Sequence, residues 1–331
     1  MKRGIVYAGM AGAVWGWVFL VPVLLPEFSP LLLSCARFIL YGAVSALLIL
    51  PNAKRLLTQL TLRDVMTLVT LALLGNLIYY MLLAAAVQWV GIAVASLIIG
   101  VLPLTISWLG RRDAGGVPLT RLIWPLLLVL AGMLCINLEA LSGADAGQPL
   151  AEKILGIACA MGALVCWTGF ATANARYLKH SSFTSSEWSS LWGVTTGVLG
   201  LLIWAVAHAL SLEAAHADVS DTRWQGFWAI NLVCAVVGSW FGNWLWNAAS
   251  RRLPLTLSGQ LIVFETLFAL FYGFVYVQRW PTLLESLAVI LLLSGVSWAV
   301  RRHAPARPPG TGLISSGRLW RRCSALVYRR G

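Results

Sequence analysis

The chain alternates between long apolar runs and short polar connections. A helix needs about 20 apolar residues to cross the hydrocarbon core of a bilayer, and runs of that length recur along the whole sequence. They predict ten membrane-spanning helices, over residues 4–25, 31–50, 65–87, 91–110, 119–138, 154–175, 186–210, 226–248, 254–277 and 281–300. The predicted fold class is therefore an all-α membrane protein.

The charged residues predict how these spans are oriented. Lys and Arg concentrate in the cytoplasmic loops of membrane proteins. If the N-terminus lies in the cytoplasm, only four of the 24 basic residues fall elsewhere: Lys153, Arg223 and Arg279 in external loops, and Arg37 inside a span. The even number of spans then places both termini in the cytoplasm.

Composition identifies the solvent as lipid. The chain is 59% hydrophobic and 11% charged, whereas soluble domains carry about 25% charged residues. Because the basic residues follow the topology, the net charge of +12 indicates membrane orientation and no nucleic-acid partner. The basic tail could also contact anionic lipid headgroups, although a merely solvated tail is the simpler alternative.

The residue types needed for catalysis or metal binding are scattered. Five of the six cysteines lie inside apolar runs, and no Cys-x-x-Cys pair occurs. The four histidines are dispersed, and neither His-Glu-x-x-His nor Gly-x-Ser-x-Gly is present. We therefore predict no enzyme, metal or cofactor. The start of the chain resembles a secretory signal, but its apolar run continues through Phe19, which favours a retained first helix.

Weak matches recur in the same order in the two halves of the chain. Gly12, Ala13 and Trp17 recur 150 residues later as Gly162, Ala163 and Trp167; Leu74-Gly75 and Ala85-Ala86 recur 163 residues later as Val237-Gly238 and Ala248-Ala249. They predict two five-helix repeats, residues 1–145 and 146–303, followed by a basic cytoplasmic tail, 304–331. Because five is odd, the repeats have inverted topology, as in secondary transporters with a substrate site near the midplane.

The ten-span layout, the Gly-Ala-x-x-x-Trp opening of each half and the stretch from Leu74-Gly75-Asn76 to Pro103 resemble the drug/metabolite transporter superfamily, of the EamA type. Within it, the tryptophan-rich eighth span and the chain length are most similar to amino-acid exporters. The resemblance covers residues 4 to 300. It implies a bacterial inner-membrane carrier exporting amino acids, aromatic compounds or cationic drugs through a cavity between the halves. One departure is Gly110-Arg111-Arg112, where the superfamily often has an acidic residue.

The eighth predicted span carries the clearest candidate site. Trp240, Asn243, Trp244 and Asn247 are spaced to form one helical stripe. Amides are poorly placed against acyl chains, so the stripe should face protein or a wet cavity. Two indoles and two carboxamides suit an amphipathic zwitterion such as an amino acid. The alternative is hydrogen bonding between packed helices.

Related positions extend this candidate cavity. Asn76, Tyr79 and Tyr80 lie on the third span, and Trp17 and Trp167 occupy matching places in the first and sixth spans. We predict that they line the cavity or stack on the substrate. The interfacial belt for the tyrosines, and wedging between helices for the tryptophans, are the alternatives.

Glu265 is the one acidic residue deep inside a predicted span. A charge there costs several kcal/mol unless it is paired or hydrated. Proton coupling or binding of a substrate ammonium group is the functional hypothesis. A structural partnership with an amide or with Arg37 is the alternative, and Arg37 could instead extend outward to the interface.

Three glycine pairs predict close helix approach: Gly12/Gly16, Gly193/Gly197 and Gly238/Gly242. The leading functional hypothesis is an amino-acid carrier working by alternating access. A drug or other metabolite carrier of the same fold is the second. A membrane-embedded enzyme, which would need a nucleophile–base pair or metal ligands, is disfavoured.

Overall fold

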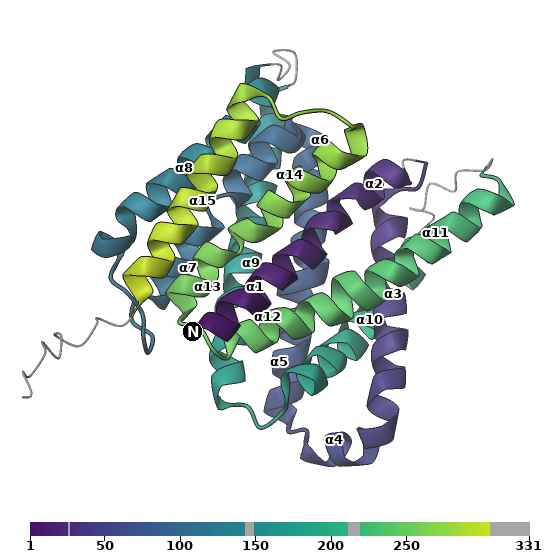
Figure 1. Ribbon diagram of the computed structural model, residues 1–331. Coiled ribbons are helices and arrows are strands. Elements are labelled where there is room, and N and C mark those ends of the chain that lie inside the picture. The colour runs from purple at the N-terminus through teal and green to yellow at the C-terminus, as the bar shows by residue number, and fades with distance from the viewer. Residues whose placement is uncertain (26, 143–148, 211–218, 305–331) are drawn as a thin grey trace, which may run out of the picture.

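The computed structural model describes residues 1–25, 27–142, 149–210 and 219–304 of the chain, and all regular structure in them is helical (Figure 1). This confirms the predicted all-α class. The predicted tail lies outside the described residues from residue 305 onward.

The first predicted half contains α1 (Lys2–Gly16), η1 (Trp17–Leu20), α2 (Val21–Leu24), α3 (Pro30–Ile49), η2 (Leu50–Asn52), α4 (Ala53–Gln59), α5 (Leu62–Ala72), η3 (Leu73–Leu77), α6 (Ile78–Ile99), α7 (Leu102–Gly110) and α8 (Leu119–Ser142). The second contains α9 (Leu150–His180), α10 (Ser185–Ala209), α11 (Asp221–Val233), η4 (Cys234–Phe241), α12 (Gly242–Ser250), α13 (Leu255–Leu261), α14 (Val263–Val277) and α15 (Leu283–His303). Labels α denote α-helices; η1 and η2 are 3₁₀-helices, and η3 and η4 are π-helices.

Eight helical segments in the described part of the chain are long and apolar enough to cross a membrane. The other two predicted spans differ in form. Residues 4–25 are divided among α1, η1 and α2, and Val94–Gly110 is a shorter apolar helix. A multi-pass membrane protein is therefore confirmed, and a count of ten crossings stays a prediction.

The boundary between the third and fourth predicted spans was placed wrongly. We expected a connection at residues 88–90, but α6 runs through it to Ile99, and the break falls at Gly100 and Val101. The cause is Pro103, whose ring clashes with the carbonyl four residues earlier. That carbonyl belongs to Ile99, the last residue of α6.

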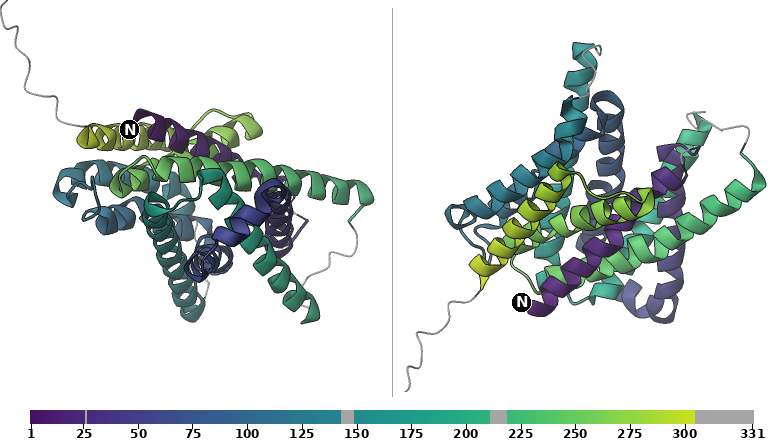
Figure 2. Two further views of the ribbon diagram at one scale, coloured as in Figure 1. Left: turned by 90° about the horizontal axis from the view of Figure 1, so that it is seen from below. Right: turned by 45° about the horizontal axis from the view of Figure 1, so that its top comes forward.

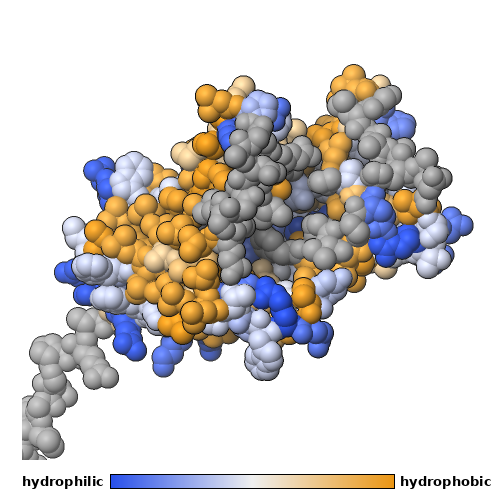
Figure 3. Space-filling view, turned by 90° about the horizontal axis from the view of Figure 1, so that it is seen from above, coloured by the Kyte–Doolittle hydropathy of each residue, from blue (hydrophilic) through white to orange (hydrophobic). Residues whose placement is uncertain are grey.

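The outer surface supports a lipid environment. Large apolar side chains project outward from α8 and α15, among them Trp124, Leu127 and Ile290, each at least 47% exposed. Hydrophobic residues dominate the left of the molecule, where these helices lie (Figure 3). A water-soluble protein rarely presents so large a contiguous apolar surface.

The predicted halves are interleaved. The most extensively packed helix pairs are α6 with α9, α3 with α10, α8 with α15, α1 with α14 and with α12, and α7 with α13. Each pair joins residues 1–145 to residues 146–303. The start of α1, the turn at α4 and the end of α15 lie toward one end of the molecule, at the bottom of Figure 1, and Figure 2 gives two further views.

Glycines set the closest of these approaches. A side chain at Gly12 would meet the Phe264 Cβ at 2.6 Å and the backbone of Phe264 and Glu265 at 2.8 Å, so α1 lies directly on α14. A side chain at Gly197 would meet the Cα of Gly42 on α3 at 2.5 Å. The predicted role of the glycine pairs in close packing is confirmed at these two contacts.

Two π-helical segments interrupt the regular helices. They are η3, which contains Leu74-Gly75, and η4, which contains Val237-Gly238. These dipeptides match at an offset of 163 residues in the sequence. Because π-helical turns are rare and often mark functional sites, both segments point to the region around them.

Candidate substrate site

The face of α12 that carries Asn243 packs against α10 and α3 through a chain of hydrogen bonds. The Asn243 amide donates to the Tyr41 hydroxyl (3.2 Å), which donates to the Ser189 carbonyl (2.7 Å). One turn earlier, the Trp240 indole donates to the Ser190 hydroxyl (2.7 Å). The polarity of this face therefore serves contacts between helices.

The other two predicted amides also have protein partners. Asn247 accepts a hydrogen bond from the Asn174 amide (2.9 Å), and Asn174 accepts one from the Trp188 indole (3.0 Å). Asn76, in η3, donates to the Thr196 hydroxyl of α10 (3.0 Å). The amides therefore form hydrogen bonds between packed helices, which was the alternative to a wet cavity in the sequence analysis.

The predicted aromatic residues fall into separate groups. Trp167 is 9% exposed and packs on Phe170 and Trp246, with ring centroids 5.6 and 6.3 Å away. Trp17 instead packs in the cluster around Val21, Leu25 and Phe28. The structure therefore does not bring Trp17 and Trp167 together.

Trp244 lies on the α1 side of α12. Its ring is 6.1 Å from Tyr7, centroid to centroid, and 5.4 Å from Phe241. Its neighbour Trp246 meets Trp15 at 5.5 Å. Trp244 and Trp246 of α12 therefore pack against α1. They do not form one surface with Trp240, which faces α10.

Glu265 lies in the first turn of α14, just after the helix discontinuity at Ile262. Its side chain is half-buried. Among the described residues its carboxylate accepts no hydrogen bond and forms no ion pair within 4.0 Å. An unpaired carboxylate inside a membrane-spanning helix is costly, so this position needs a further explanation.

Arg37 points into the protein. Its Nε donates to the Ser239 hydroxyl of η4 at 2.9 Å, and its guanidinium lies 5.8 Å from the centre of the Phe38 ring. Arg37 and Glu265 interact electrostatically without touching. The outward orientation considered from the sequence is therefore wrong, because a hydroxyl in η4 binds the side chain inside.

Tyr79 completes this group. It lies on α6, half-buried, and is close enough to Glu265 and to Tyr80 to interact with both electrostatically. No hydrogen bond of its hydroxyl occurs within the described part of the chain. We call Arg37, Tyr79 and Glu265 the interior charged group; it draws on α3, α6 and α14, from both predicted halves.

A glycine, Gly238 of η4, lies beside this group because Val18 packs too closely to leave room for a side chain. The Trp15 indole donates to the Gly238 carbonyl at 3.0 Å. A side chain at Gly238 would meet Val18 at 2.8 Å and a terminal nitrogen of Arg37 at 3.9 Å. A π-helical turn leaves backbone carbonyls free for such side-chain donors.

Sequence reasoning missed several of these residues. Tyr41, which is fully buried, was not predicted, although Arg37, Tyr41 and Ser45 recur every four residues and so share one face of α3. That polar stripe is the signal that could have found it. The described residues contain no group of three potential metal ligands, and the described surface hollows lie elsewhere, along α5 and α15.

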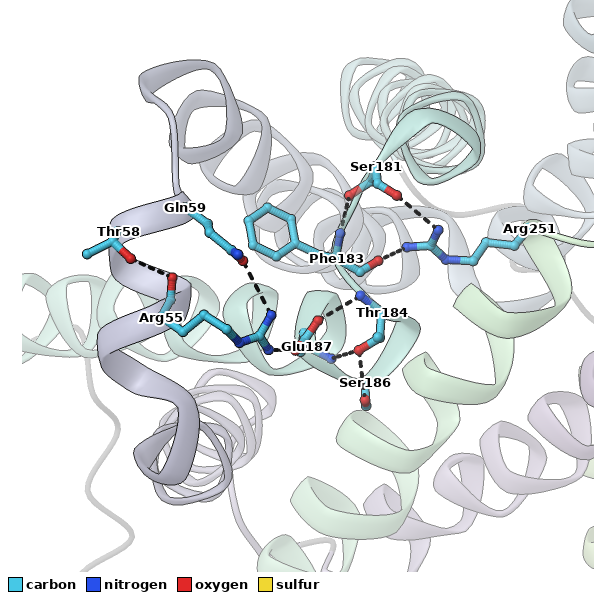
Figure 4. Close-up of polar contacts among 9 residues, drawn as sticks. All are labelled: Arg55, Thr58, Gln59, Ser181, Phe183, Thr184, Ser186, Glu187 and Arg251. Atoms are coloured by element: carbon cyan, nitrogen blue, oxygen red, sulfur yellow. Dashed lines mark hydrogen bonds and ion pairs between the residues drawn. The ribbon is translucent and has the colours of Figure 1, made fainter.

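The end of the molecule that carries α4 is held by polar contacts (Figure 4). The Arg55 guanidinium pairs with Glu187, and Arg251 donates to the Phe183 carbonyl and to the Leu178 carbonyl, the latter at 2.7 Å. The first of these contacts joins α4 to α10, and so joins the two predicted halves.

Two further polar contacts join the halves at the same end. Arg176 forms a two-pronged ion pair with Asp113 (3.0 Å for each contact), and the Tyr177 hydroxyl donates to Asp64 (2.6 Å). The three acidic residues that the predicted topology would place in the cytoplasm, Asp64, Asp113 and Glu187, therefore all have partners across the predicted halves.

Helices that pair across the chain's two portions, an apolar outer surface and charged groups inside define a polytopic membrane protein of the transporter class. Comparisons with known proteins identify the family. The EamA-like transporter family model matches residues 154–301. The inner membrane protein YtfF of Escherichia coli (strain K12) is 32% identical over 318 residues, which cover 93% of this chain and 98% of YtfF. The chain belongs to the EamA-like transporter family.

A solved crystal structure shares the fold. It superposes with a TM-score of 0.72 at 18% sequence identity, and the match covers 92% of this chain and 99% of the other. At that identity the likeness concerns the fold alone.

Proposed function

We propose that this protein is an inner-membrane carrier that exports amino acids and related amphipathic metabolites by alternating access of its two predicted repeats. The observation that carries the proposal is the Glu265 carboxylate, which is half-buried between helices of both halves and has no ion-pair or hydrogen-bond partner among the described residues. A fixed structural carboxylate would have a partner. A carboxylate that binds a substrate ammonium or a proton must be free to exchange it.

Three features support alternating access. The strongest helix pairs cross between the halves, the family match at 154–301 falls inside the second predicted half, and the π-helical segments lie at matching positions of the two. In this mechanism the polar contacts of Figure 4 hold one end closed, and they must break when that end opens.

Within this proposal the predicted site residues have two roles. The side chains of Trp17, Tyr79, Tyr80 and Trp244 form no hydrogen bond in the described residues and are candidates for direct contact with substrate. The remaining predicted site residues make interhelical contacts, and these contacts would have to rearrange before the side chains could reach the substrate. They are Asn76, Trp167, Trp240, Asn243 and Asn247. We also propose that, within the superfamily, the chain is most similar to the amino-acid exporter YddG, on the basis of its tryptophan-rich eighth span and its length.

Counterflow into vesicles tests the function. Purified protein is reconstituted with internal unlabelled threonine, methionine or phenylalanine, and uptake of the labelled amino acid is followed. Uptake above protein-free vesicles is the expected result. If no amino acid moves while a cationic drug does, the protein is a drug carrier of the same fold.

The topology is tested separately. With both termini in the cytoplasm, a reporter fused after residue 303 is active only inside the cell, and one inserted between Trp280 and Thr282 only outside. A reversed pattern would contradict the proposed orientation of the C-terminal end.

A further inference from the structure

We infer that Arg37 and Glu265 bind the two charged ends of one zwitterionic substrate, the guanidinium taking its carboxylate and Glu265 its ammonium. This inference rests on the proposed carrier function and narrows the substrate class to compounds, such as α-amino acids, that carry both charges close together.

The guanidinium is held in a way that leaves it free to bind. Arginine has five N–H donors, and Arg37 uses its Nε on Ser239 (2.9 Å). Within the described chain its terminal nitrogens donate to no protein acceptor. Those nitrogens form the edge of the fork that binds carboxylates, and Ser239 fixes the orientation of that fork.

Glu265 offers the complementary half. Its oxygens accept no hydrogen bond in the described residues, and they lie more than 4.0 Å from any described cation. The Tyr79 side chain is close enough to interact with it electrostatically. A carboxylate next to an aromatic ring suits an ammonium group, which gains from the charge and from the face of the ring.

The helix α1 fixes the spacing between the two groups. Gly12 lies against the backbone at Glu265, and Trp15 binds the Gly238 carbonyl beside Arg37. Three residues along a helix correspond to a rise of about 4.5 Å. The two charged groups therefore lie near one short segment of α1. Their charged atoms are near enough to interact electrostatically and more than 4.0 Å apart.

Charge balance favours such an occupant. Arg37 and Glu265 together are neutral, and so is a zwitterion, whose two charges compensate both groups at once. A substrate with only one charge would leave the other protein group uncompensated in the membrane interior, which is costly. The site should therefore reject analogues that lack either charge.

The test measures binding to the purified full-length protein by displacement of labelled methionine. Methioninamide lacks the carboxylate, and N-acetylmethionine lacks the ammonium; the corresponding phenylalanine and threonine derivatives are measured in parallel. The wild type should bind each analogue at least about tenfold more weakly than the amino acid, a difference of about 1.4 kcal/mol.

The variants separate the two contacts. Arg37→Gln should lose the discrimination against methioninamide and keep that against N-acetylmethionine, and Glu265→Gln should do the reverse. Arg37→Lys should retain part of the carboxylate preference. Arg121→Gln is the matched control, because Arg121 is an exposed arginine near the start of α8 and is not among the contacts of Figure 4, and it should behave as the wild type. If a Gln variant binds labelled methionine too weakly for the displacement assay, binding of each analogue is measured instead by its quenching of the tryptophan fluorescence.

The outcomes distinguish the inference from the function beneath it. If the vesicles transport an amino acid but both Gln variants weaken both analogues equally, the charged pair does not recognise the two ends, and the carrier function stands. If the wild type neither transports nor binds any of the three amino acids, the proposed function fails and the inference fails with it.

Discussion

Among the described helices, five carry an acidic residue at their third position: α5, α9, α10, α14 and α15. On α9 this residue is the exposed Glu152, so the comparison concerns the other four, and one of these is different. In three, a threonine precedes the helix, and the threonine and the acid cap each other's backbone N–H in a capping box. These three pairs are Thr61 with Asp64 on α5, Thr184 with Glu187 on α10, and Thr282 with Glu285 on α15. Their acids stabilise the start of their own helix.

Glu265 occupies the same position on α14 without this role. The residue before the helix is Ile262, which has no polar side-chain atom that could cap the helix. It is itself in helical conformation. The Glu265 backbone N–H already donates to the Ile262 carbonyl (2.9 Å). Capping of the helix start thus explains why three of these helices have a carboxylate at the third position. It does not explain the carboxylate of Glu265.

The partners show the same contrast. Glu187 pairs with Arg55, Glu285 with Arg279, and Asp64 accepts a hydrogen bond from Tyr177. Glu265 interacts with Arg37 only at a distance. The three capped acids are therefore satisfied twice, by a cap and by a neighbour, and a test of that difference from Glu265 is a test of the proposed site.

The largest effect is expected for Glu265→Gln. Initial transport rates in vesicles should fall at least about tenfold, which corresponds to about 1.4 kcal/mol of activation free energy, because the ammonium partner is lost. The melting temperature of the purified protein should not fall, since no described contact depends on the charge. If Glu265 also couples protons, the variant should lose the pH dependence of transport.

Unchanged transport by Glu265→Gln, or a melting temperature lowered as far as in a capping variant, would remove the distinction between Glu265 and the other acids. Glu265→Asp serves as the control, because it keeps the charge and should keep part of the activity.

Thr184→Ala should affect stability instead. Loss of a threonine N-cap costs about 1 kcal/mol, and here it also leaves the Glu187 backbone N–H without its acceptor (Thr184 Oγ1, 3.2 Å). The melting temperature should fall while transport per folded molecule stays close to that of the wild type. Thr184→Ser, which keeps the hydroxyl, should restore most of the stability; failure to do so would argue against capping as the cause.

Much of the fold could be predicted because lipid constrains sequence simply. Apolar runs identified the helices, and glycine pairs such as Gly12/Gly16 identified close contacts. The Thr-x-x-Asp/Glu motif before each capped helix was equally legible in the sequence. The end of α6 was harder to place: a connection was predicted at residues 88–90, whereas the helix ends at Ile99, where Pro103 interrupts it.

The candidate site was less predictable, because a polar residue within a span signals only that it avoids lipid. Whether it meets substrate or another helix depends on residues far away in the chain. Asn243 was predicted as a site residue, and its partner Tyr41 lies 202 positions earlier. Glu265 was easier to single out, because a charge is too costly to be placed inside a span without a reason.

A smaller effect is expected for Arg55→Gln, which removes the partner of Glu187 and leaves its capping box intact. The side chains are 49% and 15% exposed, and pairs of this kind contribute about 0.2–1 kcal/mol. The melting temperature should fall slightly, and the difference from the wild type should shrink at high salt. A loss as large as that of Thr184→Ala would mean that the pair, and not the cap, fixes Glu187.

The smallest effect is expected at the opposite end of the molecule, where Arg223 binds the exposed Glu27. The hydrogen bond from Arg223 lowers the pKa of Glu27 below its ordinary value. A group whose pKa is lower in the folded state contributes stability at neutral pH, and that contribution is lost as the pH falls through the ordinary glutamate pKa of about 4.3 and below.

Arg223→Gln should therefore lower the melting temperature slightly at pH 7. The difference from the wild type should narrow toward pH 3 to the part contributed by the hydrogen bond from Arg223 to the Leu24 carbonyl (2.9 Å), which does not titrate. A difference that is the same at both pH values would show that Glu27, unlike the capped acids, contributes nothing through its charge.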